Sequence, residues 1–203
     1  MNSKKYTYLA LGDSYTIGEG VTIYESFPYQ VVQLMREVGY DFYAAEIVAK
    51  TGWTTGELSD GIHRTRLLSF YDFVTLLIGV NNQFLGNDIN DYKEEFEELL
   101  KHALLLAGHQ PGHVIVLSIP DWGATPFAEE RDRTVIAKEI TAFNNANKSI
   151  SEKHKVKYID VMPGTEKALD DESLLAPDQL HPSGKEYARW ANMVSTLISS
   201  ELP

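Results

Sequence analysis

The stretch LALGDSYTIGEG, at residues 9–20, begins as an apolar strand and then breaks into small and polar residues. Three glycines lie in the turn that follows. A glycine-rich turn after a first strand is typical of a loop that binds phosphate. Ser14, however, stands in the middle of the turn directly after Asp13, as a nucleophile on a turn would. The stretch alone leaves both interpretations open.

Four short apolar runs have the composition of buried strands. They are rich in Val, Ile, Leu and Tyr, and the first three are followed directly by Gly or Pro. Continuous apolar runs of this length are typical of a parallel sheet that is covered on both faces. The runs are residues 6–11, 73–78, 114–119 and 156–161, and a weaker fifth candidate with poor alternation covers residues 43–48.

Helical patterns lie between these runs. The clearest places Tyr92, Phe96 and Leu99 on one face, with Asp91 as the expected cap and Gly108 as the stop. Alternating strands and helices predict an α/β domain with a mostly parallel sheet. No repeat or linker interrupts the pattern, so we expect a single domain over residues 1–203. The predicted helices cover residues 28–38, 90–107, 129–153 and 183–198.

The composition disfavours several classes of partner and chemistry. Twenty-nine acidic and eighteen basic residues give a net charge of −11, which repels nucleic acids and anionic membranes. The chain has no cysteine, which excludes disulfides, thiolate metal sites and a cysteine nucleophile. His109 and His113 have a spacing that suggests a metal pair, but Pro111 and Gly112 between them favour a turn.

The N-terminal segment does not resemble a signal peptide. Two lysines precede an apolar run, but the run is short and ends in Gly-Asp-Ser without a small-residue cleavage site. No apolar run approaches the length of a membrane span, so we expect no stable membrane insertion. These features favour a cytoplasmic protein, with a mature secreted chain as the alternative.

A serine hydroxyl becomes a nucleophile when a histidine removes its proton and a carboxylate orients that histidine. His181 fits this role best, because it follows the last predicted strand and has Asp178 three residues before it. Pro177 and Pro182 restrict the backbone around the pair. On its own the pattern also fits a simple turn in which Ser183 caps the last helix. Five other histidines fit a solvated surface better: His63, His102, His109, His113 and His154.

Acyl transfer also needs hydrogen-bond donors aimed at the developing oxyanion. Gly52 follows the weak fifth strand, and a glycine lets its backbone N–H approach a substrate closely. Asn81 follows the strand at residues 73–78, and its side-chain amide donates hydrogen bonds without adding charge. Taken singly, both residues are equally compatible with ordinary turns.

These segments, in this order, resemble the SGNH, or GDSL-type, hydrolase family of esterases, lipases and acylhydrolases. The resemblance covers nearly the whole chain and rests on four motifs: Gly12-Asp13-Ser14, Gly52, Gly79-Val80-Asn81-Asn82 and Asp178-x-x-His181. It implies a three-layer α/β/α, flavodoxin-like sandwich around a central, mostly parallel five-stranded sheet. It also implies hydrolysis of carboxylic esters with neither a metal nor another cofactor.

The resemblance also implies a role for each site residue. Ser14 matches the nucleophile that forms an acyl-enzyme, His181 the general base and Asp178 the residue that orients it. The oxyanion hole is expected to consist of the Ser14 and Gly52 N–H groups and the Asn81 side chain. Gly18 and Gly20 then serve loop geometry. One position departs from the family, whose third block reads Gly-x-Asn-Asp: here Asn82 replaces the aspartate, which puts the support of that loop in question.

The expected partner is a small-molecule ester, with acyl esters, thioesters, lysophospholipids and acetylated sugars all open, as is the oligomeric state. Aromatic residues near the strand ends are candidates for an apolar pocket, although each fits helix packing equally well. The alternative function is a flavodoxin-like FMN-binding module, against which Asp13 and Glu19 place negative charge beside the proposed phosphate. The aromatic candidates are Tyr15, Trp53, Phe84, Trp122 and Phe127.

Overall fold

The computed structural model describes residues 4–203, so residues 1–3, where the expected domain and the N-terminal segment begin, lie outside the described part. A five-stranded parallel sheet forms the centre, with the strand order β4-β2-β5-β6-β7. The central strands are buried along their whole length, which explains their continuous apolar sequences. The strands are β2 (Tyr8–Gly12), β4 (Glu46–Ala49), β5 (Phe73–Leu77), β6 (Val114–Leu117) and β7 (Lys157–Ile159).

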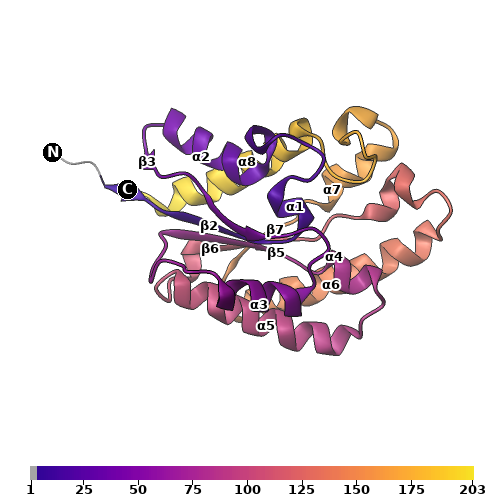
Figure 1. Cartoon of the computed structure of the whole chain (residues 1–203), viewed down its shortest axis with the longest axis horizontal. Helices are drawn as coiled ribbons and strands as arrows, with labels where there is room; N and C mark the ends of the chain where they lie inside the picture. The colour runs from indigo at the N-terminus through magenta and orange to yellow at the C-terminus, as the bar shows by residue number, and fades with distance from the viewer. Residues whose placement is uncertain (1–3) are drawn as a thin grey trace.

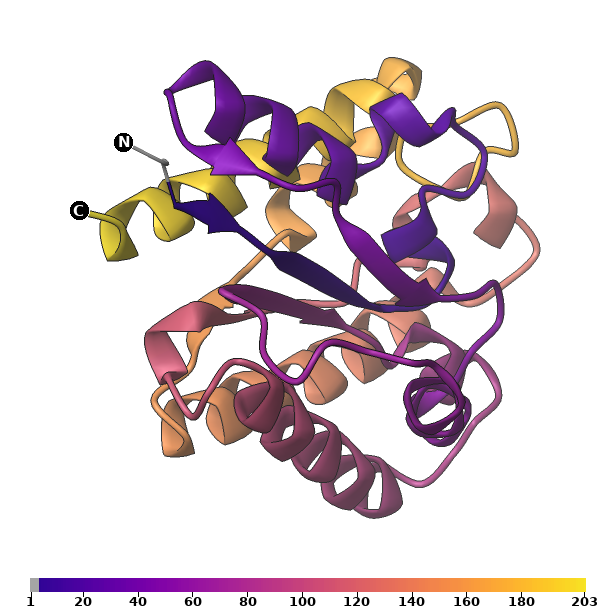
Figure 2. The same cartoon turned by 60° about the vertical axis from the view of Figure 1, so that its left-hand side comes forward.

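Helices cover both faces of this sheet, as Figure 1 shows. On one face lie α2 (Phe27–Glu37) and α8 (Gly184–Glu201), which pack against each other. On the other face lie α3 (Thr55–Arg64), α5 (Ile89–Leu106) and α6 (Arg133–Lys153). The second view, in Figure 2, shows the same separation into layers. The predicted three-layer α/β/α sandwich with a five-stranded sheet is therefore confirmed.

The first predicted strand is divided in two. Its start, β1 (Lys5–Tyr6), pairs with β3 (Asp41–Phe42) in a separate two-stranded parallel sheet, and β2 continues into the main sheet. Thr7 lies between them, and both its N–H and its hydroxyl donate to the Asp72 carboxylate, at 2.8 and 3.0 Å. A side chain thus takes the place of a backbone acceptor for the Thr7 N–H, while the Thr7 carbonyl accepts from the Phe73 N–H at 3.1 Å.

The weak fifth strand is real but shifted. It is β4, and it lies at the edge of the main sheet, where most of its side chains are only half-buried. An edge strand needs no continuous apolar sequence, which explains the poor pattern over residues 43–48.

Two helix predictions need correction near their starts, and one helix of the structure has no counterpart among the predictions. Asp88, not Asp91, caps α5, and α6 begins at Arg133 after its cap Asp132, four residues later than expected. Helix α3 is absent from the predicted helices, although a capping box of Thr54 and Glu57 marks its start. The shorter helices are α1 (Ser14–Ile17), α4 (Val80–Phe84) and α7 (Met162–Thr165), with 3-10 turns at Ile23–Glu25, Pro111–His113, Trp122–Ala124, Pro126–Ala128, Glu166–Leu169 and Glu172–Leu174.

Because the five strands are parallel, their carboxyl ends meet at one edge of the sheet, and the segments expected to carry chemistry all leave from that edge. Within residues 4–203, no helix combines the length and the apolar character that a membrane crossing requires.

Candidate active site

The turn after β2 presents Ser14 at the first position of α1. Gly12 is required there, because a Cβ on it would collide with the Thr16 hydroxyl and the Leu77 carbonyl. The Asp13 carboxylate caps the short helix by accepting from the Tyr15 N–H at 3.0 Å. The helix ends at Gly18, whose φ of 76° is the left-handed cap conformation that glycine adopts easily.

Asp13 is completely buried within the turn that carries Ser14. Burial raises the pKa of its carboxyl to about 8, although the hydrogen bond from Tyr15 acts in the opposite direction. Its second oxygen, Oδ2, has no hydrogen-bond partner among the described residues. Burial thus favours the protonated, neutral form of this carboxyl next to the serine.

The loop before α8 brings His181 to Ser14. His181 Nε2 lies 2.9 Å from Ser14 Oγ, and His181 Nδ1 lies 2.7 Å from Asp178 Oδ2. An ionised carboxylate only accepts hydrogen bonds, so Nδ1 donates to Asp178 and Nε2 accepts from the serine hydroxyl. Ser14 and His181 are 5% and 6% exposed, so the pair is largely shielded from water.

Asp178 also organises its own loop. Its Oδ1 accepts from the backbone N–H groups of Leu180 and His181, each at 3.0 Å. Partial burial tends to raise the pKa of Asp178, but the hydrogen bonds from the His181 side chain and from these N–H groups outweigh it and lower the pKa. The carboxylate thus remains charged and fixes both the position and the tautomer of the imidazole.

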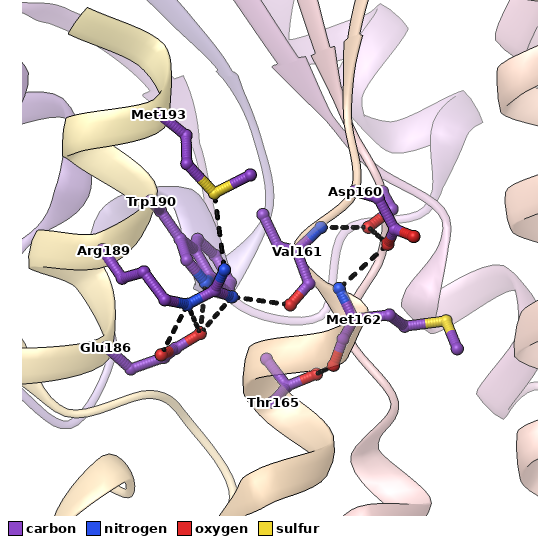
Figure 3. Close-up of polar contacts among 9 residues, drawn as sticks. Asp160, Val161, Met162, Thr165, Glu186, Arg189, Trp190 and Met193 are labelled. Atoms are coloured by element: carbon purple, nitrogen blue, oxygen red, sulfur yellow. Dashed lines mark hydrogen bonds and ion pairs between the residues drawn. The ribbon is translucent and has the colours of Figure 1, made fainter. Parts of the chain in front are cut away.

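The start of α8, which follows His181, is tied to the end of β7. Glu186 is buried and accepts from Arg189 and from Trp190 Nε1 (Figure 3). Arg189 also donates to the Val161 carbonyl at 2.8 Å, in the loop that follows β7. A Cβ on Gly164 would collide with the Arg189 guanidinium, so this approach requires glycine. The cluster holds the His181 loop against the same sheet edge as Ser14.

Gly52 and Asn81 lie on the opposite side of the serine and line the same cleft. Gly52 has a φ of 80°, which favours glycine, and its N–H and that of Ser14 donate to no acceptor within the described chain. Asn81 is in α4, and its Nδ2 donates to the Trp53 carbonyl at 2.9 Å. The second hydrogen of this amide has no acceptor among the described residues.

Asn82 supports this side of the cleft. It is 1% exposed, its Oδ1 accepts from the Thr55 N–H at 3.0 Å, and its Nδ2 donates to the Thr55 hydroxyl at 2.7 Å. Both ends of the amide are used, so the departure from the family aspartate leaves the loop with hydrogen bonds. Sequence reasoning misses Thr55 because it misses helix α3, which begins at this residue.

These groups surround a cleft of about 200 Å³. One wall is aromatic: Trp122 makes edge-to-face contacts with Phe84 and Phe127, at ring-centroid distances of 5.3 and 6.1 Å. Trp122 is held by a hydrogen bond of 2.7 Å from its Nε1 to Gln83. The lining residues are Ser14, Tyr15, Thr51, Gly52, Val80, Asn81, Phe84, Trp122, Phe127, Leu180 and His181.

The structure brings most of the sequence-predicted residues together, and Trp53 is the exception among the aromatic candidates. Four of the five aromatic candidates line the cleft: Tyr15, Phe84, Trp122 and Phe127. The Trp53 ring packs against Gly61 of α3, and only its backbone carbonyl contacts a cleft residue, by accepting from the Asn81 side chain. His181 is the one histidine of the described chain that lines the cleft. Sequence reasoning assigns no role to three further lining residues, although each directly precedes a predicted site residue in the sequence: Thr51, Val80 and Leu180.

Comparisons with known proteins agree with this geometry. The family model described as GDSL-like Lipase/Acylhydrolase matches residues 10–189. Comparison with curated proteins finds no match. Among solved structures, a lipase/acylhydrolase from Enterococcus faecalis is 20% identical with a TM-score of 0.74, and 98% of this chain and 97% of that chain are covered.

Two further solved structures share the fold. A variant of an acetyl-xylooligosaccharide esterase from Geobacillus stearothermophilus is 17% identical, with a TM-score of 0.75 over 98% of this chain and 95% of that one. A psychrotrophic esterase from Pseudoalteromonas sp. is 16% identical, with a TM-score of 0.68 over 97% of this chain and 98% of that one. Because the family model covers most of its length, this chain belongs to the GDSL-like lipase/acylhydrolase family and is a carboxylic ester hydrolase.

Proposed function

We propose that this enzyme cleaves its ester through an acyl-enzyme at Ser14, with His181 as general base and Asp178 as the residue that orients it. The observation that carries the proposal is the continuous chain of two hydrogen bonds, from Ser14 Oγ to His181 Nε2 and from His181 Nδ1 to Asp178 Oδ2, at 2.9 and 2.7 Å. Nucleophile, base and orienting carboxylate within hydrogen-bond reach are the pattern of an activated serine.

In the first half of the reaction, His181 takes the proton of Ser14 as Oγ attacks the ester carbonyl carbon. The tetrahedral intermediate collapses, the bond to the alcohol oxygen breaks, and His181 gives the proton to the departing alcohol. In the second half, His181 takes a proton from water, the resulting hydroxide attacks the acyl carbon, and Ser14 leaves with that proton restored.

The negative charge on the tetrahedral oxygen needs fixed donors. We assign this role to the N–H groups of Ser14 and Gly52, which have no acceptor within the described chain, and to the free hydrogen of the Asn81 amide. Three donors that are already oriented before the reaction stabilise the oxyanion without reorganisation at the moment of attack.

The cleft favours an uncharged ester with a short acyl group. Its volume of about 200 Å³ lies below the ~300–1,000 Å³ of sites for drug-sized ligands. The wall formed by Trp122, Phe84 and Phe127 suits an apolar group or the face of a sugar ring, and the net charge of −11 disfavours anionic substrates. Acetyl esters, including acetylated sugars, therefore fit better than long-chain lipids.

Hydrolysis of a panel of esters tests this function. The panel runs from acetyl to long-chain nitrophenyl esters and includes an acetylated xylose oligomer, with Ser14→Ala as the blank. Loss of a serine nucleophile costs about 10⁶ in kcat in a serine protease, so we expect the variant to show only background hydrolysis. Ser200→Ala, an exposed serine at the end of α8, is the matched control and should retain full activity.

Two results would contradict the proposal. One is a folded Ser14→Ala variant with the parent activity, which would place the nucleophile elsewhere. The other is equal activity on acetyl and long-chain esters, which would argue against a short acyl site. The Pseudoalteromonas esterase is described as inhibited by monoethylphosphonate, so a phosphonate ester that labels the peptide containing Ser14 gives an independent readout by mass spectrometry.

The FMN-binding alternative predicts a yellow protein with an accessible loop after β2. In this turn the Ser14 hydroxyl bonds to His181, and the Glu19 carboxylate accepts a hydrogen bond from Thr51. A phosphate at this position would meet the Glu19 carboxylate and displace the serine contact. A visible absorption spectrum of the purified protein distinguishes the two functions.

A further inference from the structure

Two consecutive asparagines in α4 hold the segment that follows β4. Asn81 donates to the Trp53 carbonyl at 2.9 Å, and Asn82 makes two hydrogen bonds to Thr55, at 3.0 and 2.7 Å. Gly52 directly precedes Trp53. The distance between Gly52 and Asn81, the two donors on this side of the cleft, is therefore set by contacts that α4 makes one and three residues beyond Gly52.

The direction of the hydrogen bonds around Thr55 is determined by the amide of Asn82. Since Nδ2 of Asn82 donates to the Thr55 hydroxyl, that hydroxyl has to give its single hydrogen to another acceptor. The acceptor is the Glu95 carboxylate on α5. Asn82 is buried and Glu95 is exposed, so the one negative charge of this hydrogen-bond chain lies at the water-facing end.

We propose that Asn82 is a positioning residue of the oxyanion hole, and that the hydrogen-bond chain Asn82–Thr55–Glu95 replaces the aspartate that the family pattern has at position 82. The inference rests on the proposed function, because it assigns Asn82 to the support of the Gly52 and Asn81 donors. It goes beyond that function by naming Thr55 and Glu95, on two other helices, as parts of one unit.

The hydrogen-bond chain accepts a carboxylate at only one of its two ends. In an Asn82→Asp variant, the Thr55 hydroxyl would face two carboxylates, the introduced one and that of Glu95, and could donate to only one. The buried carboxylate would keep the Thr55 N–H but lack a donor for its other oxygen, or it would be forced to take up a proton, because burial and a nearby like charge both disfavour ionisation. In Asn82→Asp/Glu95→Gln the chain reverses: the introduced glutamine amide donates to Thr55, and Thr55 donates to the introduced aspartate.

A double-mutant cycle on kcat and KM tests the inference. The four proteins are the parent, Asn82→Asp, Glu95→Gln and the double variant, each measured from pH 6 to pH 9 on the best ester of the panel. A small displacement of a catalytic group can cost up to about 100-fold, so we expect kcat of Asn82→Asp to fall roughly ten- to a hundredfold with little change in KM. The loss should deepen as pH rises, because a protonated carboxyl at this buried position is tolerated better than a charged one.

The remaining two variants complete the expected pattern. Glu95→Gln should stay near the parent, since the glutamine oxygen still accepts from Thr55. The double variant should recover most of the activity lost in Asn82→Asp and should lose its dependence on pH. Such non-additivity is the mark of residues in one network.

Thr55→Val keeps the N–H contact to Asn82 and removes only the hydroxyl, so it tests the chain if Asn82→Asp folds poorly. It should lower kcat with KM unchanged. Thr65→Val, which removes a hydroxyl at the other end of α3, is the matched control. Additive losses in the cycle, or equal kcat for Thr55→Val and Thr65→Val, would overturn the inference. A parent protein that hydrolyses no ester of the panel would instead overturn the proposed function, and the inference with it.

Discussion

The two sides of the cleft are built in different ways. On the side of His181, the groups that would react are bonded directly to one another, from Ser14 through His181 to Asp178. On the side of Asn81, the donors Gly52 and Asn81 are joined only through backbone and side chains behind them, at Trp53 and Thr55. On the His181 side, the proposed catalytic groups hold one another in position. On the Asn81 side, the donors are held in position by the packing of the helices behind them.

This difference indicates which substitutions should reduce the activity on each side of the cleft. The side of Ser14 and His181 depends on three residues that sequence motifs mark, because the hydrogen bonds among these residues are the ones proposed to act in the reaction. The oxyanion side depends on residues whose function is indirect, so changes at a distance should disturb it. We therefore expect substitutions of the first kind to cause the largest losses and those behind the oxyanion hole to cause smaller, tunable ones.

After loss of the Ser14 nucleophile itself, the largest expected effect comes from breaking the serine side at Asp178. In Asp178→Asn the amide no longer fixes the imidazole tautomer, and the equivalent change in a serine protease lowers kcat by about 10⁴. Steady-state kinetics on the best ester measures the loss. Asp171→Asn, a partly exposed aspartate of the same loop, is the control and should keep the parent rate. A parent-like kcat in Asp178→Asn would mean that Asp178 does not act directly on His181 during the reaction, and the contrast between the two sides would be wrong.

A smaller effect is expected from the donor on the other side. Asn81→Ala removes an oxyanion donor and should lower kcat by about 10² to 10³ with KM little changed, because the contact strengthens only in the transition state. Asn87→Ala, an exposed asparagine just after α4, controls for the removal of an amide from this region. If Asn81→Ala raised KM and left kcat intact, Asn81 would bind the ground state instead of the oxyanion.

The smallest effect on activity is expected for a substitution at Asp13. The role of this residue should instead be visible in the pH dependence of the free energy of unfolding. Because the folded-state pKa is raised by burial to about 8, Asp13 is mostly neutral at pH 7, and Asn imitates that form and can still accept from Tyr15. The folded state holds this proton between about pH 4 and pH 8 while the unfolded state releases it. The free energy of unfolding of the parent therefore falls as pH rises through this window.

In Asp13→Asn this contribution, up to about 1.4 kcal/mol for each pH unit between the two pKa values, should vanish. Urea unfolding at pH 5 and pH 8.5 measures it for both proteins, with Asp171→Asn as a control that keeps the parental slope. The same decline of stability with pH in Asp13→Asn as in the parent would show that Asp13 is ionised when folded.

Much of the fold follows from local patterns. The buried strands have continuous apolar sequences, and the long helices have one apolar face, so both can be recognised without a structure. The exceptions have local causes. Asp72 interrupts the first strand at Thr7, and the edge position of β4 weakens its pattern. Helix α3 escapes the prediction even though its capping box at Thr54 and Glu57 is legible in the sequence.

The residues of the candidate site also fall into two groups, those that a sequence motif marks and those that only the structure reveals. Short motifs at the ends of strands mark the five residues proposed to act in catalysis, and the structure brings four of them to line one cleft: Ser14, Gly52, Asn81 and His181, with Asp178 bonded behind His181. Their catalytic roles stay predictions until the variants are measured. No motif marks Thr55 or Glu95, because a hydrogen bond between two helices depends on where the helices pack.

The sequence by itself thus determined the family, the layered fold and the residues proposed to react, since each depends on local periodicity or on a short motif. Only the tertiary structure decided how those residues are held: the tie from Arg189 to Val161, the aromatic wall at Trp122, and the hydrogen bonds that link Asn82 through Thr55 to Glu95. The physical reason is that these contacts join residues far apart in the chain, and hydrogen-bond direction and burial exist only once the helices have packed against the sheet.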